Sequence, residues 1–548
     1  MLFRFQYYTT ILFFLTVSPL IFSGVLCAQA VPASANASGT SVQKPEAQKT
    51  TAPKRKPKRK ELTPEQQERL DSFARMAQEG GQDSQGAPNA SVRTNGNFQA
   101  PTTSGYHGSV ARPRPIVLDK QLIAQNKLNI IETPHLILVT DMPWDEDLKL
   151  WPEYTNQLIE RLCAYFEIDK KQAESWQITA FLMKNNVPFM MSDLLPDFIP
   201  QFEYGFSYNS YVWLFYQESR DYQRHLFLHE CTHSFMNHFV GGCGPVWYGE
   251  GLAEYFGTHR IVTGKLETGI IPRSRNEFPH WGRIKYIQND LQNGVFVPLF
   301  GMLTSDLKSQ DTRSYSWAWA MIWMMSAQPE YKANILKMSK QMANINQQAA
   351  SYRDRSDLFN ELYRGLYDDA QWLTYCSAWA AFVSELDYGC SLSSVTIADK
   401  PVHPLSRPAT ITVQTNQGWQ NTGVQLEQGK TYRIKAQGKF IVRKPQKGIS
   451  NSKLWPCEPN GVTIRYVHQL PLGILLGAVV VPDEGFNEKP AGFNNPIPIG
   501  YEKTWTVEET GALWLKINES PAERSDNSGT ISVDLEIVEP AKQAEAEK

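Results

Sequence analysis

The sequence predicts an α+β domain followed by an all-β sandwich. Strand-like apolar runs and one stretch of helical spacing open the first domain, and a mainly helical pattern follows over residues 220–392. After Pro401 the pattern changes to short β-rich runs between Gly, Asn and Pro turns, which is typical of a β-sandwich or jelly roll. We therefore place the first domain at residues 116–395 and the second at residues 396–540.

Local patterns predict the elements of both domains. In the first, strands are expected at residues 136–140, 178–182 and 211–216, where β-branched and aromatic residues gather. Residues 143–167 repeat apolar side chains at helical spacing. The strands expected in the second domain are ATITVQT, TYRIKAQGKFIVR, GVTIRYV, ALWLKIN and TISVDLEIV. Residues 541–548 are interpreted as a disordered tail.

The composition narrows the class of protein. The 548 residues carry 54 Lys+Arg and 56 Asp+Glu, a net charge of −2, whereas a dedicated nucleic-acid binder carries a basic face. Hydrophobic residues make up 42% and charged residues 20%, as in ordinary folded soluble proteins. With 35 Gly and 34 Pro, collagen-like and wholly disordered chains are excluded.

The N-terminus predicts export. Arg4 precedes an apolar run at residues 11–26, and Ala28-Gln29-Ala30 then forms an A-x-A cleavage site. We expect a signal peptide at residues 1–30 and a periplasmic, cell-surface or secreted protein. The alternative is an uncleaved membrane anchor. No later stretch is long and apolar enough to predict a transmembrane helix.

Residues 31–115 are rich in small and polar residues and lack apolar periodicity, so we expect a disordered linker. Its basic run, Lys54 to Lys60, either attaches the chain to an anionic surface or is a solvated part of the linker.

Six cysteines follow the signal peptide, and six allow 15 pairings. Disulfides and buried thiols are both open, and the nearest pairs are Cys231/Cys243 and Cys376/Cys390.

The motif that carries chemistry is His229-Glu230-Cys231-Thr232-His233, an H-E-x-x-H in an apolar stretch. On a helix, residues i and i+4 lie on one face, so both imidazoles can bind one zinc ion. Glu230 lies further around the helix and can act as a general base. The alternative is a helix with two solvent or core histidines. Cys231 and the flanking His225 and His238 are interpreted as structural.

A turn cluster at residues 241–245 separates this motif from a second expected helix, residues 247–257, which can return antiparallel to the first. Glu250 and Glu254 are four residues apart on it and point the same way. A catalytic zinc site has three protein ligands and one open position, and Glu250 can supply the third ligand. Glu254 can hydrogen-bond a ligand histidine and fix its tautomer.

These two helices resemble the gluzincin metallopeptidases, and most of all the peptidase MA-like branch, which carries a W-x-x-E-G-L-A-E-Y helix. The resemblance implies a zincin-like catalytic domain in which His229, His233 and Glu250 bind zinc. Glu230 is then the general base, and Glu254 hydrogen-bonds a ligand histidine without binding the metal. In gluzincins a strand before the motif can hold a peptide substrate by β-addition, and strand 211–216 is the candidate edge strand. No G-x-M-E-N-like segment precedes the motif, which favours endopeptidase action or a narrow native substrate over general aminopeptidase action.

Peptide hydrolysis also needs a donor for the developing oxyanion. Related enzymes use a Tyr or His later in the chain. Tyr315 is chosen because family members often carry a Y-x-x-W-A-like helix downstream. His259 and His280 are the other candidates. The alternative interpretation of residues 313–324 is an aromatic core helix.

The second domain is similar to the calcium-dependent galactose-binding lectins of the PA-IL type. In that resemblance a single loop carries calcium ligands, and Glu519, Glu523, Asp526 and Asn527 stand at the corresponding positions. All four offer the oxygen atoms that Ca²⁺ requires. The resemblance implies Ca²⁺ and a glycan ligand. The alternatives are a sandwich that shields or orients the first domain, and a plain hairpin turn at Asp-Asn-Ser-Gly.

Together these patterns predict an exported zinc metallopeptidase that acts on a peptide or protein substrate and carries a carbohydrate- or surface-binding sandwich. The main alternative is a non-catalytic, zinc-containing surface protein that binds glycans. Hydrolysis of a non-peptide amide is a third reaction class, because a fold does not fix the substrate.

Overall fold

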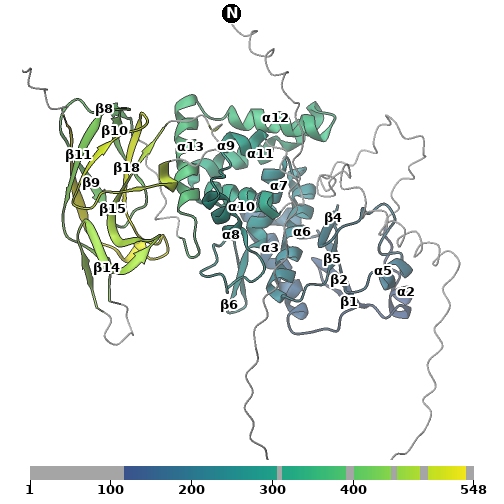
Figure 1. Ribbon diagram of the computed structural model, residues 1–548. Helices are drawn as coiled ribbons and strands as arrows, with labels where there is room; N and C mark the ends of the chain where they lie inside the picture. Colours follow the sequence, from purple (N-terminus) through teal and green to yellow (C-terminus); the bar gives the residue numbers. More distant parts are fainter. Residues whose placement is uncertain are drawn as a thin grey trace, which may run out of the picture. The chain divides into compact units, whose positions relative to one another are not determined.

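A computed structural model describes residues 116–304, 312–390, 400–445, 453–481, 485 and 492–538, all within the compact unit Thr63–Lys548. The expected signal peptide (1–30), linker (31–115) and tail (541–548) lie outside the described residues. The described segments form a mixed α+β structure of helices and open sheets (Figure 1).

The first sheet has five strands in the order β1-β2-β3-β5-β4. Its three interior strands are parallel, and β1 and β4 are antiparallel edges. The strands are β1 Asn129–Glu132, β2 Leu136–Thr140, β3 Ile178–Met183, β4 Gly205–Tyr208 and β5 Tyr211–Phe215. All three expected strands are present.

The prediction that strand 211–216 forms the sheet edge is wrong. This segment is β5, which lies between β3 and β4. The true edge, β4, is only four residues long and begins with Gly205, so its sequence has little strand character.

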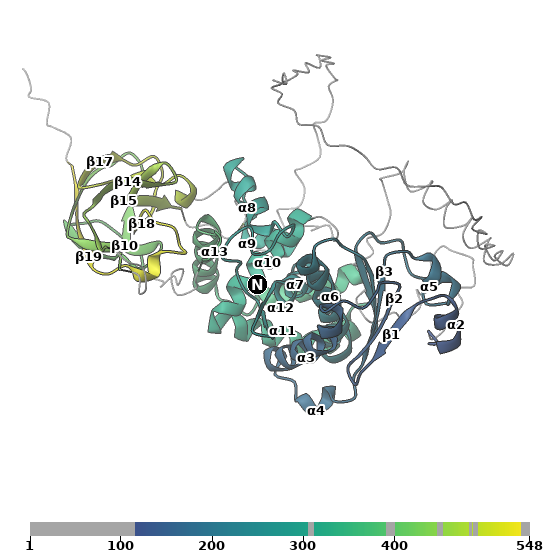
Figure 2. The same ribbon diagram turned by 90° about the horizontal axis from the view of Figure 1, so that it is seen from below.

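Helices cover both faces of this sheet, because successive side chains of a strand point to opposite faces. Leu138 belongs to the core shared with α3 and α6, and the next residue, Val139, belongs to the core shared with α2 and α5. Figure 2 shows the sheet between these two pairs of helices. The helices are α2 Lys120–Gln125, α3 Trp151–Phe166, α5 Val187–Met191 and α6 Arg220–Phe235.

The expected helix 143–167 begins only at Trp151, with Pro152 in its first turn, where a missing N–H costs nothing. The remainder of the first domain is mainly helical, as predicted, apart from one hairpin. Its elements are α4 Lys170–Ala173, α7 Val246–Gly257, β6 His259–Val262, β7 Lys265–Thr268, α8 Arg283–Gln292, α9 Leu299–Thr304, α10 Thr312–Ala327, α11 Pro329–Gln348, α12 Tyr352–Arg364 and α13 Asp369–Ser384.

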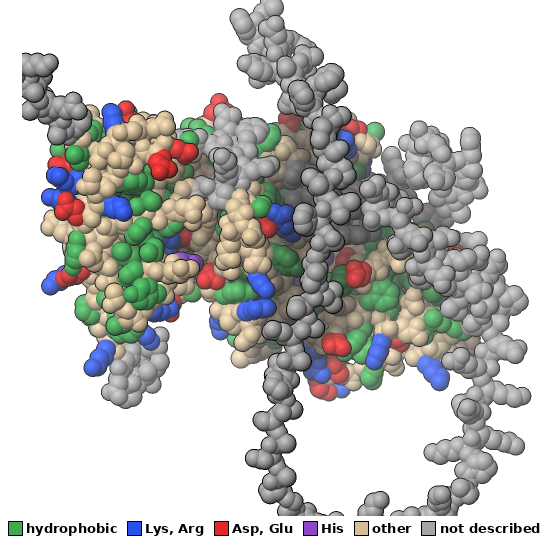
Figure 3. Space-filling model, viewed as in Figure 1, with side chains coloured by type: hydrophobic (Ala, Val, Ile, Leu, Met, Phe, Trp, Pro, Cys, Tyr) green, Lys and Arg blue, Asp and Glu red, His purple; other side chains and the backbone are tan. Residues whose placement is uncertain are grey.

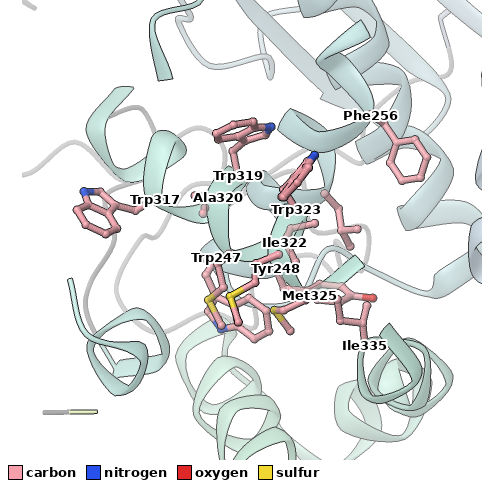
Figure 4. Packing of buried hydrophobic residues seen from close by; sticks show 14 of the residues in the cluster. Trp247, Tyr248, Phe256, Trp317, Trp319, Ala320, Ile322, Trp323, Met325 and Ile335 are labelled. Atoms are coloured by element: carbon pink, nitrogen blue, oxygen red, sulfur yellow. The ribbon is translucent and has the colours of Figure 1, made fainter. Parts of the chain in front are cut away.

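Helix α10 packs against α7 and forms much of the core beneath it. Figure 4 shows Trp247 and Tyr248 of α7 close to Ile322 and Met325 of α10. All four side chains are buried. This contact fixes α7, which carries Glu250 and Glu254.

The later strands form two main sheets and one small pair, which agrees with an all-β second domain. The sheet orders are β14-β15-β18-β10-β8, with β16 on β15, and β17-β11-β19-β9; β12 pairs with β13. The strands are β8 His403–Pro404, β9 Ala409–Gln414, β10 Gln420–Leu426, β11 Thr431–Gln437, β12 Phe440–Arg443, β13 Trp455–Cys457, β14 Asn460–Val467, β15 Leu470–Val480, β16 Ile497–Pro498, β17 Glu502–Thr506, β18 Gly511–Ile517 and β19 Thr530–Ile537.

A buried charge cluster joins the end of α13 to the sandwich. Glu385 accepts hydrogen bonds from Lys516 at 2.6 Å and from Arg524 at 2.8 and 3.0 Å. Burial alone would raise the pKa of Glu385, but the charges of Arg524 and Lys516 lower it to about 2. Removing one partner would leave a buried charge uncompensated, which costs about 3–5 kcal/mol, so the contact between α13 and the sandwich depends on all three residues.

The structure bears on the expected surface charge, on membrane-spanning helices and on the state of the cysteines. Acidic and basic side chains are interspersed over the face seen in Figure 3, in keeping with the near-zero net charge. Within the described residues, no helix has the length and apolar character needed to cross a membrane. The six described cysteines are buried thiols and not disulfides, which settles the alternative left open above.

Candidate metal centre

Two neighbouring helices carry the predicted site. Helix α6 begins after Ser219, whose hydroxyl accepts a hydrogen bond from the Tyr222 amide. It ends in a π-helical turn at Met236–Val240, and a glycine-rich turn then reverses the chain into α7. This reversal lays Glu250 against the histidines of the H-E-x-x-H motif.

His229, His233 and Glu250 form a compact triangle of donor atoms. The two histidine Nε2 atoms are 3.2 Å apart, and Glu250 Oε2 lies 3.2 Å from His233 Nε2 and 3.3 Å from His229 Nε2. A tetrahedral ion with bonds of about 2.0–2.1 Å places its ligand atoms about 3.3 Å from one another. All three side chains are buried, so the group can hold a metal ion.

The electrostatics of this triangle favour positive charge. Burial alone would raise the pKa of Glu250, but the charge of His233 and hydrogen bonds from both histidines lower it to about 2. Burial would lower the pKa of His229, yet its hydrogen bonds to Glu250 and Glu254 raise it to about 9. A metal cation satisfies the same preference.

Glu254 lies behind His229, as the sequence analysis expected. Its Oε1 atom is 3.4 Å from His229 Nδ1. Arg283 donates to both oxygens of this carboxylate, at 2.8 and 2.9 Å, and is itself buried. Arg283 was not predicted, because it stands 29 residues after Glu254 and outside every motif.

His225 was interpreted as structural, and the structure gives it a more specific place. It is fully buried, and its Nε2 atom is 3.4 Å from Glu254 Oε1. With His229 and Glu254 it forms a second group of donor atoms close enough to share an ion. The i, i+4 spacing from His225 to His229 was the signal that could have indicated this.

The general-base candidate Glu230 lies against the edge strand. A Cβ atom at Gly205 of β4 would come within 2.7 Å of Glu230 Oε1, so β4 can pass this carboxylate only because Gly205 has no side chain. Glu230 is buried, and burial raises its pKa. A carboxylate with a raised pKa is better matched to proton transfer near neutral pH.

Tyr315 lies beside the site, at the start of α10. Its ring centroid is 6.1 Å from that of His229 and 5.9 Å from Arg283 Cζ. The aromatic core helix expected as the alternative is also present, because Trp317, Trp319 and Trp323 are buried in α10. The two interpretations are compatible.

The other oxyanion candidates are less suited. His259 Nδ1 lies 2.8 Å from the Gly257 carbonyl oxygen, and its Nε2 accepts from Arg224 Nε at 3.2 Å. Both ring nitrogens of His259 therefore already have partners. His280 is exposed at a positive φ of 69°.

The proposed calcium residues are only partly assembled. Glu519 and Asn527 are buried, and the Asn527 amide donates to Glu519 and, at 2.8 Å, to the Thr415 carbonyl. Glu523 is paired instead with Arg465 at 2.5 Å. Among the described residues, Glu519, Glu523 and Asp526 do not form a group of three acids close enough to share an ion.

Comparisons with known proteins give weak similarity only. No family model and no curated protein matches the chain. The EclA N-terminal domain, a PllA-like lectin, is 20% identical with a TM-score of 0.18, over 24% of this chain and 95% of that one. An aminopeptidase N family protein from Idiomarina loihiensis is 12% identical with a TM-score of 0.25, over 75% of this chain and 69% of that one.

Proposed function

We propose that this chain is an exported zinc metallopeptidase of the gluzincin type. The observation that supports it most is the donor triangle of His229, His233 and Glu250, whose edges of 3.2–3.3 Å suit a tetrahedral zinc ion. Zinc bound there would polarise a scissile carbonyl and lower the pKa of water. Export is inferred from the N-terminal sequence.

Three side chains of this chain are assigned to proton transfer, to orientation of a ligand histidine and to stabilisation of the oxyanion. Glu230 takes a proton from the attacking water and returns it to the leaving nitrogen. Glu254, held by Arg283, lies 3.4 Å from His229 Nδ1, where it can accept the Nδ1–H and so direct Nε2 at the metal site. Tyr315 donates a hydrogen bond to the oxyanion that develops on the carbonyl.

The edge strand β4 suits a peptide substrate. An unpaired edge can add a peptide as a further strand through backbone hydrogen bonds. Glu230 lies directly against β4 at Gly205, so an added peptide would run past the base. Endopeptidase action is proposed because no G-x-M-E-N-like segment precedes the H-E-x-x-H motif.

Zinc-loaded protein is expected to cleave unstructured peptides at internal bonds. Chelation should remove the activity and added zinc should restore it, because the metal supplies the electrophile. The check is mass spectrometry of the products from a mixed peptide library. Zinc-loaded protein that cleaves no peptide would favour the non-catalytic surface protein.

Calcium binding by the sandwich is a second candidate function. Asn527 Oδ1 and Asp526 Oδ1 are buried acceptors without a hydrogen-bond partner among the described residues. Burial also raises the pKa of Glu519 to about 7. Glu519, Asp526 and Asn527 would hold the ion and expose it to a glycan, whereas Glu523 is left out because Arg465 already binds it.

Calcium titration of the full chain is expected to show one site that E519Q weakens. E523Q should leave the affinity unchanged, because Glu523 contacts Arg465 and not the proposed ion. Isothermal titration calorimetry measures both. The absence of calcium binding in the wild-type chain, or equal losses in the two variants, would refute this candidate.

A further inference from the structure

Cys243 lies directly behind one of the proposed zinc ligands. Its Sγ atom is 3.4 Å from His233 Nδ1, whereas the other ring nitrogen, Nε2, faces Glu250 at 3.2 Å. The same sulfur is 3.4 Å from Asn237 Oδ1. Only 3% of Cys243 is exposed, so water does not compete for these contacts.

The donors and acceptors of His233, Cys243 and Asn237 fit one another in a single direction. A neutral histidine that binds metal through Nε2 carries its proton on Nδ1. In that tautomer the His233 N–H would point at the Cys243 sulfur, which can accept it. The thiol S–H then donates to Asn237 Oδ1, which can only accept. The thiol can also donate to the His233 carbonyl oxygen, at 3.8 Å, and either acceptor leaves the sulfur able to accept from Nδ1. The contacts therefore favour the tautomer of His233 that leaves Nε2 available to a metal.

The backbone around Cys243 holds its sulfur in this place. Its turn contains Gly241, Gly242 and Gly244, all at positive φ, which favours glycine. A Cβ atom at Gly249 of α7 would lie 2.6 Å from the Cys243 carbonyl oxygen and 2.9 Å from its Cβ atom. Helix α7 can therefore press the turn against His233 only because Gly249 has no side chain.

We propose that Cys243 is a positioning residue of the metal centre, which orients His233 as Glu254 orients His229. The inference depends on the proposed zinc site. Partners of this kind are generally worth 10–100-fold in metal affinity, and sulfur is a weak acceptor, so we expect an effect of about tenfold.

The test compares zinc affinity, by competition with a chelator, in the full chain and in three variants. C243A removes the acceptor and should weaken zinc binding about tenfold, whereas C243S restores an acceptor and should recover most of the loss. C231A is the matched control, because Cys231 is also a buried thiol and, among the described residues, no hydrogen bond joins its side chain to His229, His233 or Glu250. It should lower the melting temperature of the metal-free chain without weakening zinc binding.

Three results would overturn the inference. They are a C243A chain that binds zinc as tightly as wild type, a C243S chain no better than C243A, or an equal loss in C231A. Each of these leaves the proposed zinc site intact. A wild-type chain that binds no zinc would instead overturn both the site and the role of Cys243.

Discussion

Replacing Glu230 by Gln is expected to abolish peptide hydrolysis while zinc stays bound. Glutamine has nearly the same size but cannot take a proton from the attacking water. A positioned acid–base group contributes about 10²–10⁴-fold, so we expect kcat to fall by about 10³-fold. Zinc should remain, because Glu230 is not part of the donor triangle. The measurements are kcat on a cleaved peptide and zinc per chain.

Tyr315→Phe serves as the comparison in the same assay. Removing one oxyanion donor costs about 10²–10³-fold in kcat in other hydrolases, so a smaller loss than in E230Q is expected. Activity retained in E230Q would remove Glu230 from the mechanism. Activity lost together with zinc would mean that the variant had damaged the site and not the proton transfer.

Arg283→Met is expected to cause the largest loss of stability. Arg283 and Glu254 are both buried, and they form a two-point ion pair at 2.8 and 2.9 Å. Burial alone would raise the pKa of Glu254, but Arg283 holds it well below its usual value. Removing Arg283 leaves a buried carboxylate without its main partner, which costs about 3–5 kcal/mol. Urea unfolding of the metal-free chain measures this.

Arg433→Met is the matched control on the surface. Arg433 pairs with Glu502 and Glu536, but 42% of its side chain is exposed. Exposed pairs contribute about 0–1 kcal/mol, so this variant should unfold almost like wild type. Equal losses of unfolding free energy in the two variants would show that the buried Arg283–Glu254 pair contributes no more than an exposed ion pair.

Local patterns explain what could be predicted from the sequence. The i, i+4 spacings of His229 with His233 and of Glu250 with Glu254 each need only one helix, so the faces of α6 and α7 follow from the sequence. The β-rich runs after residue 401 likewise predicted β9, β11, β12, β14, β18 and β19, because each run carries its own pattern. Strands β10, β15 and β17 lie outside these runs and were not predicted.

Long-range contacts explain what could not be predicted. The edge strand β4 is short and follows no strong pattern, so only the pairing of its neighbours reveals it. Arg283 reaches Glu254 from α8, and Cys243 reaches His233 from a turn. The contact of Arg465 with Glu523, which removes one expected calcium ligand, likewise joins distant parts of the chain.

The most direct test of the central claim is the zinc content of the purified full chain beside a His229→Ala variant. His229 supplies one corner of the donor triangle, so its loss leaves two ligands where zinc needs three. We predict about one zinc ion per wild-type chain, lost in the variant, since a catalytic site of this kind holds one ion. A wild-type chain without zinc after reconstitution, or a variant that keeps it, would contradict the proposed metal centre.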